Sequence, residues 1–189
     1  MNLKEFKDLN VLNNIPIMRD NTINHLYSII NKINNCEILE IGTALGYSSF
    51  FLAQSKQVKS IITLEKDLKR FEFAKNILFK FDNVKCINTS AFDFVSDKKF
   101  DVIILDGPKS HQDQLFDKFK NNLKNGGMFF IDNLYLKKIS ANNNLTKNQS
   151  KLITKLNVFN LFLDNLDKNL WLVEKYDVDD GYALVYSKN

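Results

Sequence analysis

The stretch that most constrains this chain covers residues 36–51, with the sequence CEILEIGTALGYSSFF. It joins a short apolar run to a turn bounded by Gly42 and Gly46, and a helix-like segment follows the turn. The apolar run is typical of a strand buried on both faces, and the glycines allow the chain to pass close under a ligand. A strand, a turn and a helix in this order predict one unit of a doubly wound sheet, with a ligand site at the turn.

Apolar runs and helical patterns alternate five times along the chain. Strands are expected at 38–41, 60–64, 84–87, 100–105 and 128–131, and helices at 47–54, 67–81, 112–123 and 150–166. This alternation predicts an α/β fold, in which a parallel sheet has helices on both faces and right-handed crossovers. Two further β-rich runs, 171–174 and 182–187, predict an antiparallel hairpin at the sheet edge and bring the sheet to seven strands.

The size of the chain suits a single domain. With 189 residues and 44% hydrophobic content, residues 1–189 are expected to bury one core. Helical patterns at 3–11 and 22–33 place a helical segment, residues 1–35, ahead of the sheet, as core cover, a lid or an oligomer surface. No apolar run approaches the roughly 18 residues of a membrane span, and the first residues are polar, so we expect a cytoplasmic protein without membrane contact.

Two acids near strand ends indicate which ligand the turn holds. Glu40 lies near the end of the first strand, where a carboxylate is costly to bury without a partner, and a ligand amine would be a favourable one. The alternative is that Glu40 is a satisfied buried acid or a cap. Glu65 ends the second strand, roughly 20 residues after Gly42, the separation at which an acid holds ribose hydroxyls.

A phosphate-bearing ligand fits this pattern poorly. The turn has no Gly-Lys-Ser/Thr ending and no G-x-G-x-x-G, which disfavours nucleotide-phosphate binding and an NAD-dependent oxidoreductase. An acid near the turn would also repel a pyrophosphate. S-adenosylmethionine carries an adenosine, an ammonium group and a sulfonium without any phosphate, and is therefore the expected cofactor.

A second polar set follows the fourth and fifth strands. Asp106 ends one of these strands, and Asp132 and Asn133 end the other. If the two strands are neighbours, these side chains converge as an all-oxygen set, which favours Mg²⁺, Ca²⁺ or Mn²⁺ over Zn²⁺. Each acid alone could instead cap the helix that follows its strand.

A lysine close to this set is a candidate general base. Lys109 lies three residues after Asp106, where a bound divalent cation and partial burial would both disfavour its charged form. The alternative is a solvated turn lysine. His111 is a competing base, but its imidazole, two residues further on, is expected to point elsewhere.

Four motifs together resemble a known family. ILEIGTALGYSS, TLEKD, FDVIILDGPKS and GGMFFIDN, in this order and spacing, resemble the metal-dependent S-adenosylmethionine O-methyltransferases related to catechol O-methyltransferase. The resemblance runs from residue 15 to about residue 187. Within the family, the chain looks most like the small bacterial branch that methylates 5-hydroxyuridine at the tRNA wobble position, in which a segment like Ile-Pro-Ile-Met precedes the sheet.

The resemblance implies a role for each matching position. Met18 and Ser48 line the methionine and sulfonium end of the cofactor, Glu65 holds the ribose, and Lys109 is the base. The implied cofactor-binding residues are Met18, Glu40, Gly42, Tyr47, Ser48, Glu65, Ser90, Ala91 and Asp106, and the implied metal ligands are Asp106, Asp132 and Asn133. A homodimer is also implied.

The chain departs from the family pattern at two places. Thr89-Ser90-Ala91 stands where bacterial relatives often have Gly-Asp-Ala, which changes the expected contact with the adenine. The metal loop reads Asp-Gly-Pro-Lys instead of Asp-Ala-x-Lys, which keeps the ligand and the lysine and stiffens the turn.

The charge distribution is compatible with RNA. The net charge is +4, and no acid occurs between Asp132 and Asp164. The basic residues of this acid-free segment, which could hold the phosphates of a tRNA loop, are Lys137, Lys138, Lys147, Lys151 and Lys155. The alternatives are the same chemistry on a small catechol-like phenol, and an RNA-binding module with a vestigial cofactor cleft.

Overall fold

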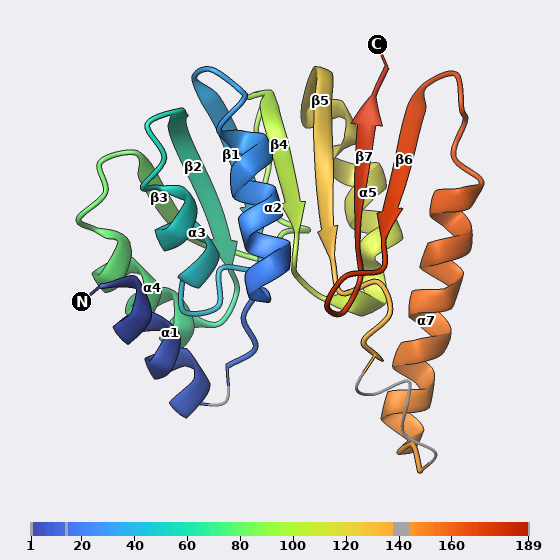
Figure 1. The fold of residues 1–189 in the computed structure, drawn as a ribbon, viewed down its shortest axis with the longest axis horizontal. Helices are drawn as coiled ribbons and strands as arrows, with labels where there is room; N and C mark the ends of the chain where they lie inside the picture. The colour runs from blue at the N-terminus through green and yellow to red at the C-terminus, as the bar shows by residue number, and fades with distance from the viewer. Residues whose placement is uncertain (1, 14, 138–143, 189) are drawn as a thin grey trace.

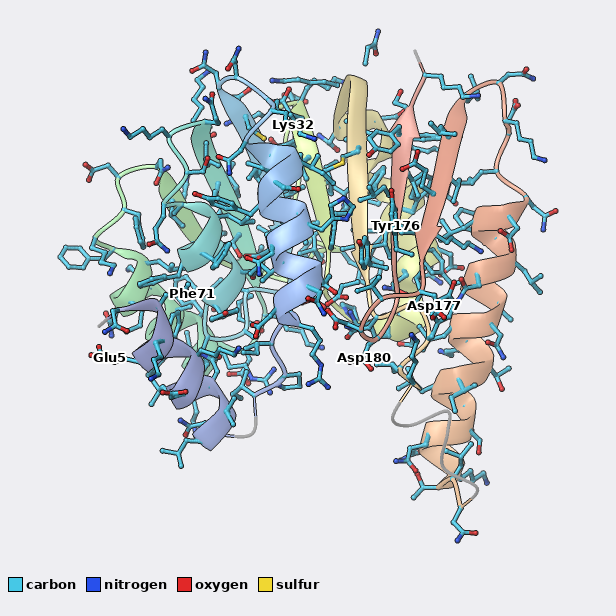
Figure 2. The ribbon with its side chains drawn as sticks, in the orientation of Figure 1. Glu5, Lys32, Phe71, Tyr176, Asp177 and Asp180 are labelled. Carbon is cyan, nitrogen blue, oxygen red and sulfur yellow. The ribbon has the colours of Figure 1, made fainter. Side chains whose placement is uncertain are left out.

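The computed structural model describes residues 2–13, 15–137 and 144–188, which form a seven-stranded sheet in the order β3-β2-β1-β4-β5-β7-β6 (Figure 1). All pairs from β3 to β5 are parallel, whereas β7 is antiparallel to both of its neighbours. The expected doubly wound sheet with an edge hairpin is therefore confirmed. The strands are β1 (Cys36–Ile41), β2 (Val58–Glu65), β3 (Val84–Asn88), β4 (Phe100–Leu105), β5 (Leu123–Asp132), β6 (Trp171–Tyr176) and β7 (Tyr182–Ser187).

Helices cover both faces of the sheet because successive residues of each buried strand point to opposite sides. On β1, Ile38 belongs to the core layer shared with α1 to α4, and Leu39 to the layer shared with α5 and α7. None of the described helices combines the length and apolar character needed to cross a bilayer. The helices are α1 (Leu3–Leu12), α2 (Asp20–Ile30), α3 (Tyr47–Leu52), α4 (Leu68–Leu78), α5 (Gln112–Phe119) and α7 (Lys147–Asp164), with 3-10 turns η1 (Lys109–His111) and η2 (Lys120–Asn122).

Several element boundaries differ from the prediction, and two of them have a clear structural reason. The helix expected to reach residue 123 ends at Phe119, and β5 already begins at Leu123, which pairs with Phe100 of β4. The Lys124 ammonium lies 2.8 Å from the Asp101 carboxylate, so tertiary pairing holds this segment in the sheet despite the glycines that follow. At α7, a capping box between Thr146 and Gln149 starts the helix at Lys147, three residues before the predicted start.

The N-terminal helix lies at the carboxyl ends of the parallel strands. In Figure 1 these ends point down, and α1 lies at the same end of the molecule beside α3 and α4. The Phe6 ring packs 5.2 Å from the Phe50 ring and 6.2 Å from the Tyr47 ring of α3, centroid to centroid. An ion pair of 2.6 Å between Lys7 and Asp20 ties α1 to the start of α2. The role of residues 1–35 as a lid or an oligomer surface stays a prediction.

Candidate active site

A cavity of about 670 Å³ opens at the carboxyl ends of β1 to β5. This is where open α/β sheets bind their ligands, since loops from several strands meet there. Eight of the residues predicted from the sequence line it: Gly42, Glu65, Ser90, Ala91, Asp106, Lys109, Asp132 and Asn133. The structure thus brings together residues that lie up to about 90 positions apart in the chain, as parallel strands with a common edge allow.

The first turn requires its glycines. Gly42 has φ +104°, and a Cβ atom there would lie 2.7 Å from the backbone oxygen of Asp106. Gly46 has φ +93°, and a Cβ atom there would lie 2.8 Å from a side-chain carbon of Leu78. Only glycine permits this close approach of the β1 and β4 ends, so the turn can pass under a ligand as expected.

Glu65 is held rigidly at the edge of the cavity. Its side chain is buried, and its two carboxylate oxygens accept hydrogen bonds from the backbone N–H groups of Ala44 (2.8 Å) and Asp67 (2.9 Å). The carboxylate therefore faces the cleft from the end of β2, where the sequence placed it. Its contact with a ribose stays a prediction.

Glu40 lies behind the cavity wall. Its carboxylate is fully buried and accepts hydrogen bonds from the hydroxyls of Ser48, Ser49 (2.5 Å) and Thr63 (2.6 Å). Burial raises the pKa of Glu40, and these three hydrogen bonds oppose that shift. Glu40 is not among the described residues that line the cavity. Its hydrogen bonds thus support the alternative of a satisfied buried acid, and a ligand amine as its partner stays a prediction.

A small side pocket of about 20 Å³ adjoins the same turn. Met18 and Ser48, which the resemblance assigns to the methionine end of the cofactor, line it together with Tyr47, another implied cofactor-binding residue. The pocket shares Gly42 and Asp106 with the main cavity. The predicted methionine-end residues are therefore grouped together, beside the predicted metal ligands.

Asp106, Lys109 and Asp132 meet at one end of the main cavity. Lys109 Nζ lies 2.6 Å from Asp106 Oδ1 and 3.3 Å from the backbone oxygen of Asp132. Burial, and then the neighbouring Asp106 charge, raise the pKa of Asp132 to about 7, while Lys109 acts in the opposite direction. The backbone N–H of Asn133, a residue with φ +61°, donates a hydrogen bond of 2.7 Å to Asp132 Oδ1.

This donor set fits a hard divalent cation. The described residues contain no cluster of three or more His, Cys, Asp or Glu side chains, and the predicted set consists of two carboxylates and one amide. Burial and the Asp106 charge both raise the pKa of the Asp132 carboxyl, and a bound cation would oppose both effects. Oxygen donors without nitrogen or sulfur are typical of magnesium or calcium sites. The metal itself stays a proposal.

Several cavity residues were not predicted from the sequence. Lys66 and Arg70 line the cavity beside Glu65, and Phe92 extends the polar segment that was predicted to end at Ala91. His111 also lines the cavity, and the expectation that its imidazole points away from the metal set stays a prediction. Its ring faces Phe92, with centroids 5.9 Å apart, and its Nδ1 lies 2.7 Å from Ser110 Oγ.

The fold and the cavity together define a Rossmann-like methyltransferase. A family described as a methyltransferase domain matches residues 32–177, about three quarters of the chain. The chain belongs to this family.

Solved structures share the fold. A candidate caffeoyl-CoA O-methyltransferase from Staphylococcus aureus has 25% sequence identity and a TM-score of 0.88, over 99% of this chain and 92% of that one. The O-methyltransferase from Bacillus cereus in complex with SAH has 20% identity and a TM-score of 0.81, over 98% and 90%. TomG from Streptomyces achromogenes, an O-methyltransferase in complex with SAM, has 18% identity and a TM-score of 0.80, over 99% and 89%. The expected enzyme class, an S-adenosylmethionine-dependent O-methyltransferase, is confirmed.

Proposed function

We propose that this enzyme is a divalent-metal-dependent O-methyltransferase that methylates 5-hydroxyuridine at the tRNA wobble position. The observation that carries the proposal is the convergence of Asp106, Lys109 and Asp132 at one end of a cavity whose wall also includes Glu65. Asp106, Lys109 and Asp132 suit a cation and an acceptor hydroxyl, and Glu65 suits a ribose. The methyl donor then lies between them, with its methionine end toward the side pocket.

Each residue has a distinct task in this proposal. Glu65, fixed by two backbone N–H groups, accepts hydrogen bonds from the ribose hydroxyls. Asp106, Asp132 and Asn133 hold the cation, which when bound supplies Lewis-acid polarisation of an acceptor hydroxyl. Lys109 Nζ donates to Asp106 in the metal-free protein, and a bound cation would disfavour its charged form, so that the neutral amine could take the acceptor proton. Alignment supplies much of the rate, because effective molarities in well-oriented reactions reach about 10⁵ M or more.

The acceptor is proposed from its chemistry and from a basic surface. A 5-hydroxyuracil presents a hydroxyl beside a carbonyl, a pair that suits an oxygen-seeking cation as a catechol does. Lys147, Lys151 and Lys155 are exposed at four-residue spacing on α7, and the amino-terminal half of α7 extends past the carboxyl ends of the strands (Figure 1). Such a row of charges could hold the phosphates of an RNA loop near the cavity.

Two of the five predicted RNA-binding lysines contribute less to this proposal. Lys137 pairs with Asp177, with 2.7 Å between Nζ and Oδ1, so part of its charge is already neutralised. Lys138 lies outside the described residues. The proposed RNA surface therefore depends on the three lysines of α7.

A small catechol-like phenol is the second candidate acceptor. The Staphylococcus aureus protein, the most similar structure described above, is named for a caffeoyl thioester, and caffeoyl groups are catechols. The non-enzymatic alternative, an RNA-binding module with a vestigial cleft, is disfavoured by the family match. A homodimer is proposed from the resemblance alone and can be checked by sedimentation.

Mass spectrometry of nucleosides tests the proposed acceptor. Purified protein is incubated with S-adenosylmethionine, Mg²⁺ and tRNA that carries 5-hydroxyuridine, in parallel with a catechol, over a series of salt concentrations. We expect 5-methoxyuridine to form, and its yield at limiting tRNA to fall steeply with salt because counterions compete for the phosphates. Methylation of the catechol alone, without dependence on salt, would establish the second candidate instead.

A further inference from the structure

Asn10 of α1 carries a buried hydrogen-bond acceptor that lacks a partner. The side chain is fully buried, and its Nδ2 donates a hydrogen bond of 2.7 Å to the backbone oxygen of Phe6. Because a carbonyl oxygen can only accept, this contact fixes which amide atom is nitrogen. The remaining atom, Oδ1, has no hydrogen-bond partner among the described residues. Such atoms are rare in folded proteins and call for an explanation.

Asn10 is one of the residues that line the side pocket next to the first turn, together with Ser48 and Asp106. Its position is fixed by tertiary contacts. The Phe6 ring anchors α1 on α3, and the backbone N–H of Ile15 donates a hydrogen bond of 2.9 Å to the backbone oxygen of Asn10. The unpartnered oxygen is therefore a built feature of the pocket wall.

The side pocket has the size and polarity for one cationic group. Its volume of about 20 Å³ holds a single group of the size of a water molecule. Asn10 Oδ1 offers an unsatisfied acceptor, whereas the Ser48 hydroxyl already donates to Glu40. Asp106, another lining residue, adds a negative charge that its contact with Lys109 partly neutralises. An unsatisfied acceptor beside an acidic residue favours an ammonium group, which is donor-only, and disfavours a carboxylate.

We propose that Asn10 Oδ1 binds the ammonium group of the methyl donor's amino-acid end. This inference rests on the proposed function, because it requires the donor to lie in the cavity with its methionine end toward the side pocket. It adds α1 to the cofactor site and assigns a binding role to a residue outside the family motifs. The buried oxygen that is unsatisfied in the free protein then gains a charge-assisted hydrogen bond when the ligand enters.

Isothermal titration calorimetry on two ligands tests the proposal. S-adenosylhomocysteine carries the ammonium group, whereas 5′-methylthioadenosine shares the adenosine and sulfur but lacks the amino-acid end. Asn10→Leu keeps a similar side-chain volume and removes the acceptor. We expect the Kd of this variant for S-adenosylhomocysteine to rise about ten-fold or more, as for loss of a hydrogen bond to a charged group. Its Kd for 5′-methylthioadenosine should be unchanged.

Asn13→Leu is the matched control. Asn13 makes the same kind of bond one turn later, from its Nδ2 to the backbone oxygen of Leu9 at 2.8 Å, but it is exposed and does not line the side pocket. Both Kd values should be unchanged in this variant. A general weakening of α1 would affect the two asparagine variants alike, whereas loss of an ammonium contact affects Asn10→Leu alone.

The possible results of the calorimetry distinguish a failure of the proposed function from a failure of the proposed role of Asn10. If the native protein binds neither ligand, the proposed function is wrong. If Asn10→Leu binds S-adenosylhomocysteine as the native protein does, or loses both ligands equally, only the role of Asn10 is wrong. A crystal structure of the native protein with S-adenosylhomocysteine decides the matter even if the variant does not fold. We expect the ligand nitrogen within about 3.2 Å of Asn10 Oδ1, and a water molecule between them would overturn the proposal.

Discussion

The backbone N–H of Ala44 donates a hydrogen bond of 2.8 Å to Glu65 Oε2, so the turn after β1 is joined to the end of β2. Ala44 has φ +48°, a conformation uncommon for a residue with a side chain, and the bond to Glu65 helps to hold it. The second carboxylate oxygen accepts from Asp67 at the start of α4. One buried acid thus positions two walls of the cavity and is proposed to bind the ribose.

Glu65→Ala should weaken cofactor binding strongly. We expect the Kd for S-adenosylhomocysteine to rise about 10- to 100-fold, because the ribose loses a charged acceptor and the turn loses its tie. Calorimetry measures this directly. Glu72→Ala, which removes an exposed acid on the neighbouring helix α4, is the control and should leave the Kd unchanged. Equal Kd values for Glu65→Ala and the native protein would exclude Glu65 from the site.

The raised pKa of Asp132 predicts how the stability of the metal-free protein depends on pH. An unfolded aspartate has a pKa of about 3.9, whereas the folded carboxyl has a pKa of about 7. Between these values the folded state holds a proton that the unfolded state has lost, so this contribution to stability is complete below about pH 4 and is lost as the pH rises through about 7. Denaturant unfolding at a series of pH values in EDTA measures it.

Asp132→Asn should flatten this pH dependence, because an amide does not titrate. Asp97→Asn, at an exposed position, is the control and should keep the native profile. A native-like fall in stability from pH 4 to 7 in Asp132→Asn would show that another group is responsible.

Glu40 is predicted to act on stability more than on ligand contact. Glu40→Ala leaves the hydroxyls of Ser48, Ser49 and Thr63 without their common acceptor and opens a cavity, so the free energy of unfolding should fall by about 2–5 kcal/mol. Thr63→Ala removes only one hydrogen-bond donor to Glu40, so the free energy of unfolding should fall by about 1 kcal/mol. Urea denaturation measures both. A Glu40→Ala protein as stable as the native one would contradict the role of Glu40 as a support for the turn.

The lysines of α7 give a prediction specific to RNA. Charge reversal of Lys147, Lys151 and Lys155 to glutamate should lower kcat/KM on tRNA by about ten-fold or more and reduce its dependence on salt. Activity on a catechol should be unchanged. The control reverses three exposed lysines far from α7 in the sequence, Lys4, Lys32 and Lys56. Equal losses in the two triple variants would indicate a general charge effect and no specific RNA surface.

Much of the fold was predictable because local pattern and tertiary structure agree. The buried strand at 100–105 and the strand at 182–187, which lies between β5 and β6, were predicted to the residue, since each is a short β-rich run between turn signals. The end of α5 was not predicted correctly, because it is set by the pairing of Leu123 with Phe100 and by the ion pair between Lys124 and Asp101. Neither partner is close in the sequence.

The site residues that lie at the carboxyl ends of the parallel strands could be predicted from the sequence. Asp106 and Asp132 were expected together because parallel strands share an edge, and the structure places both in one cavity. The three hydroxyl donors of Glu40 were not predicted, because they come from α3 and β2, which no local pattern links to Glu40. Asn10 was missed for a similar reason. Its significance lies in an unpaired oxygen that only three-dimensional packing reveals.

Methyl transfer with and without divalent metal tests the central claim most directly. The native protein and Asp106→Ala are assayed with labelled S-adenosylmethionine and a 5-hydroxyuridine-containing anticodon stem-loop, first in EDTA and then with excess Mg²⁺. We predict that the native protein is inactive in EDTA and recovers with Mg²⁺, and that Asp106→Ala stays inactive in both. Full turnover by the native protein in EDTA, or restored turnover by Asp106→Ala, would contradict the metal-dependent site formed by Asp106, Asp132 and Asn133.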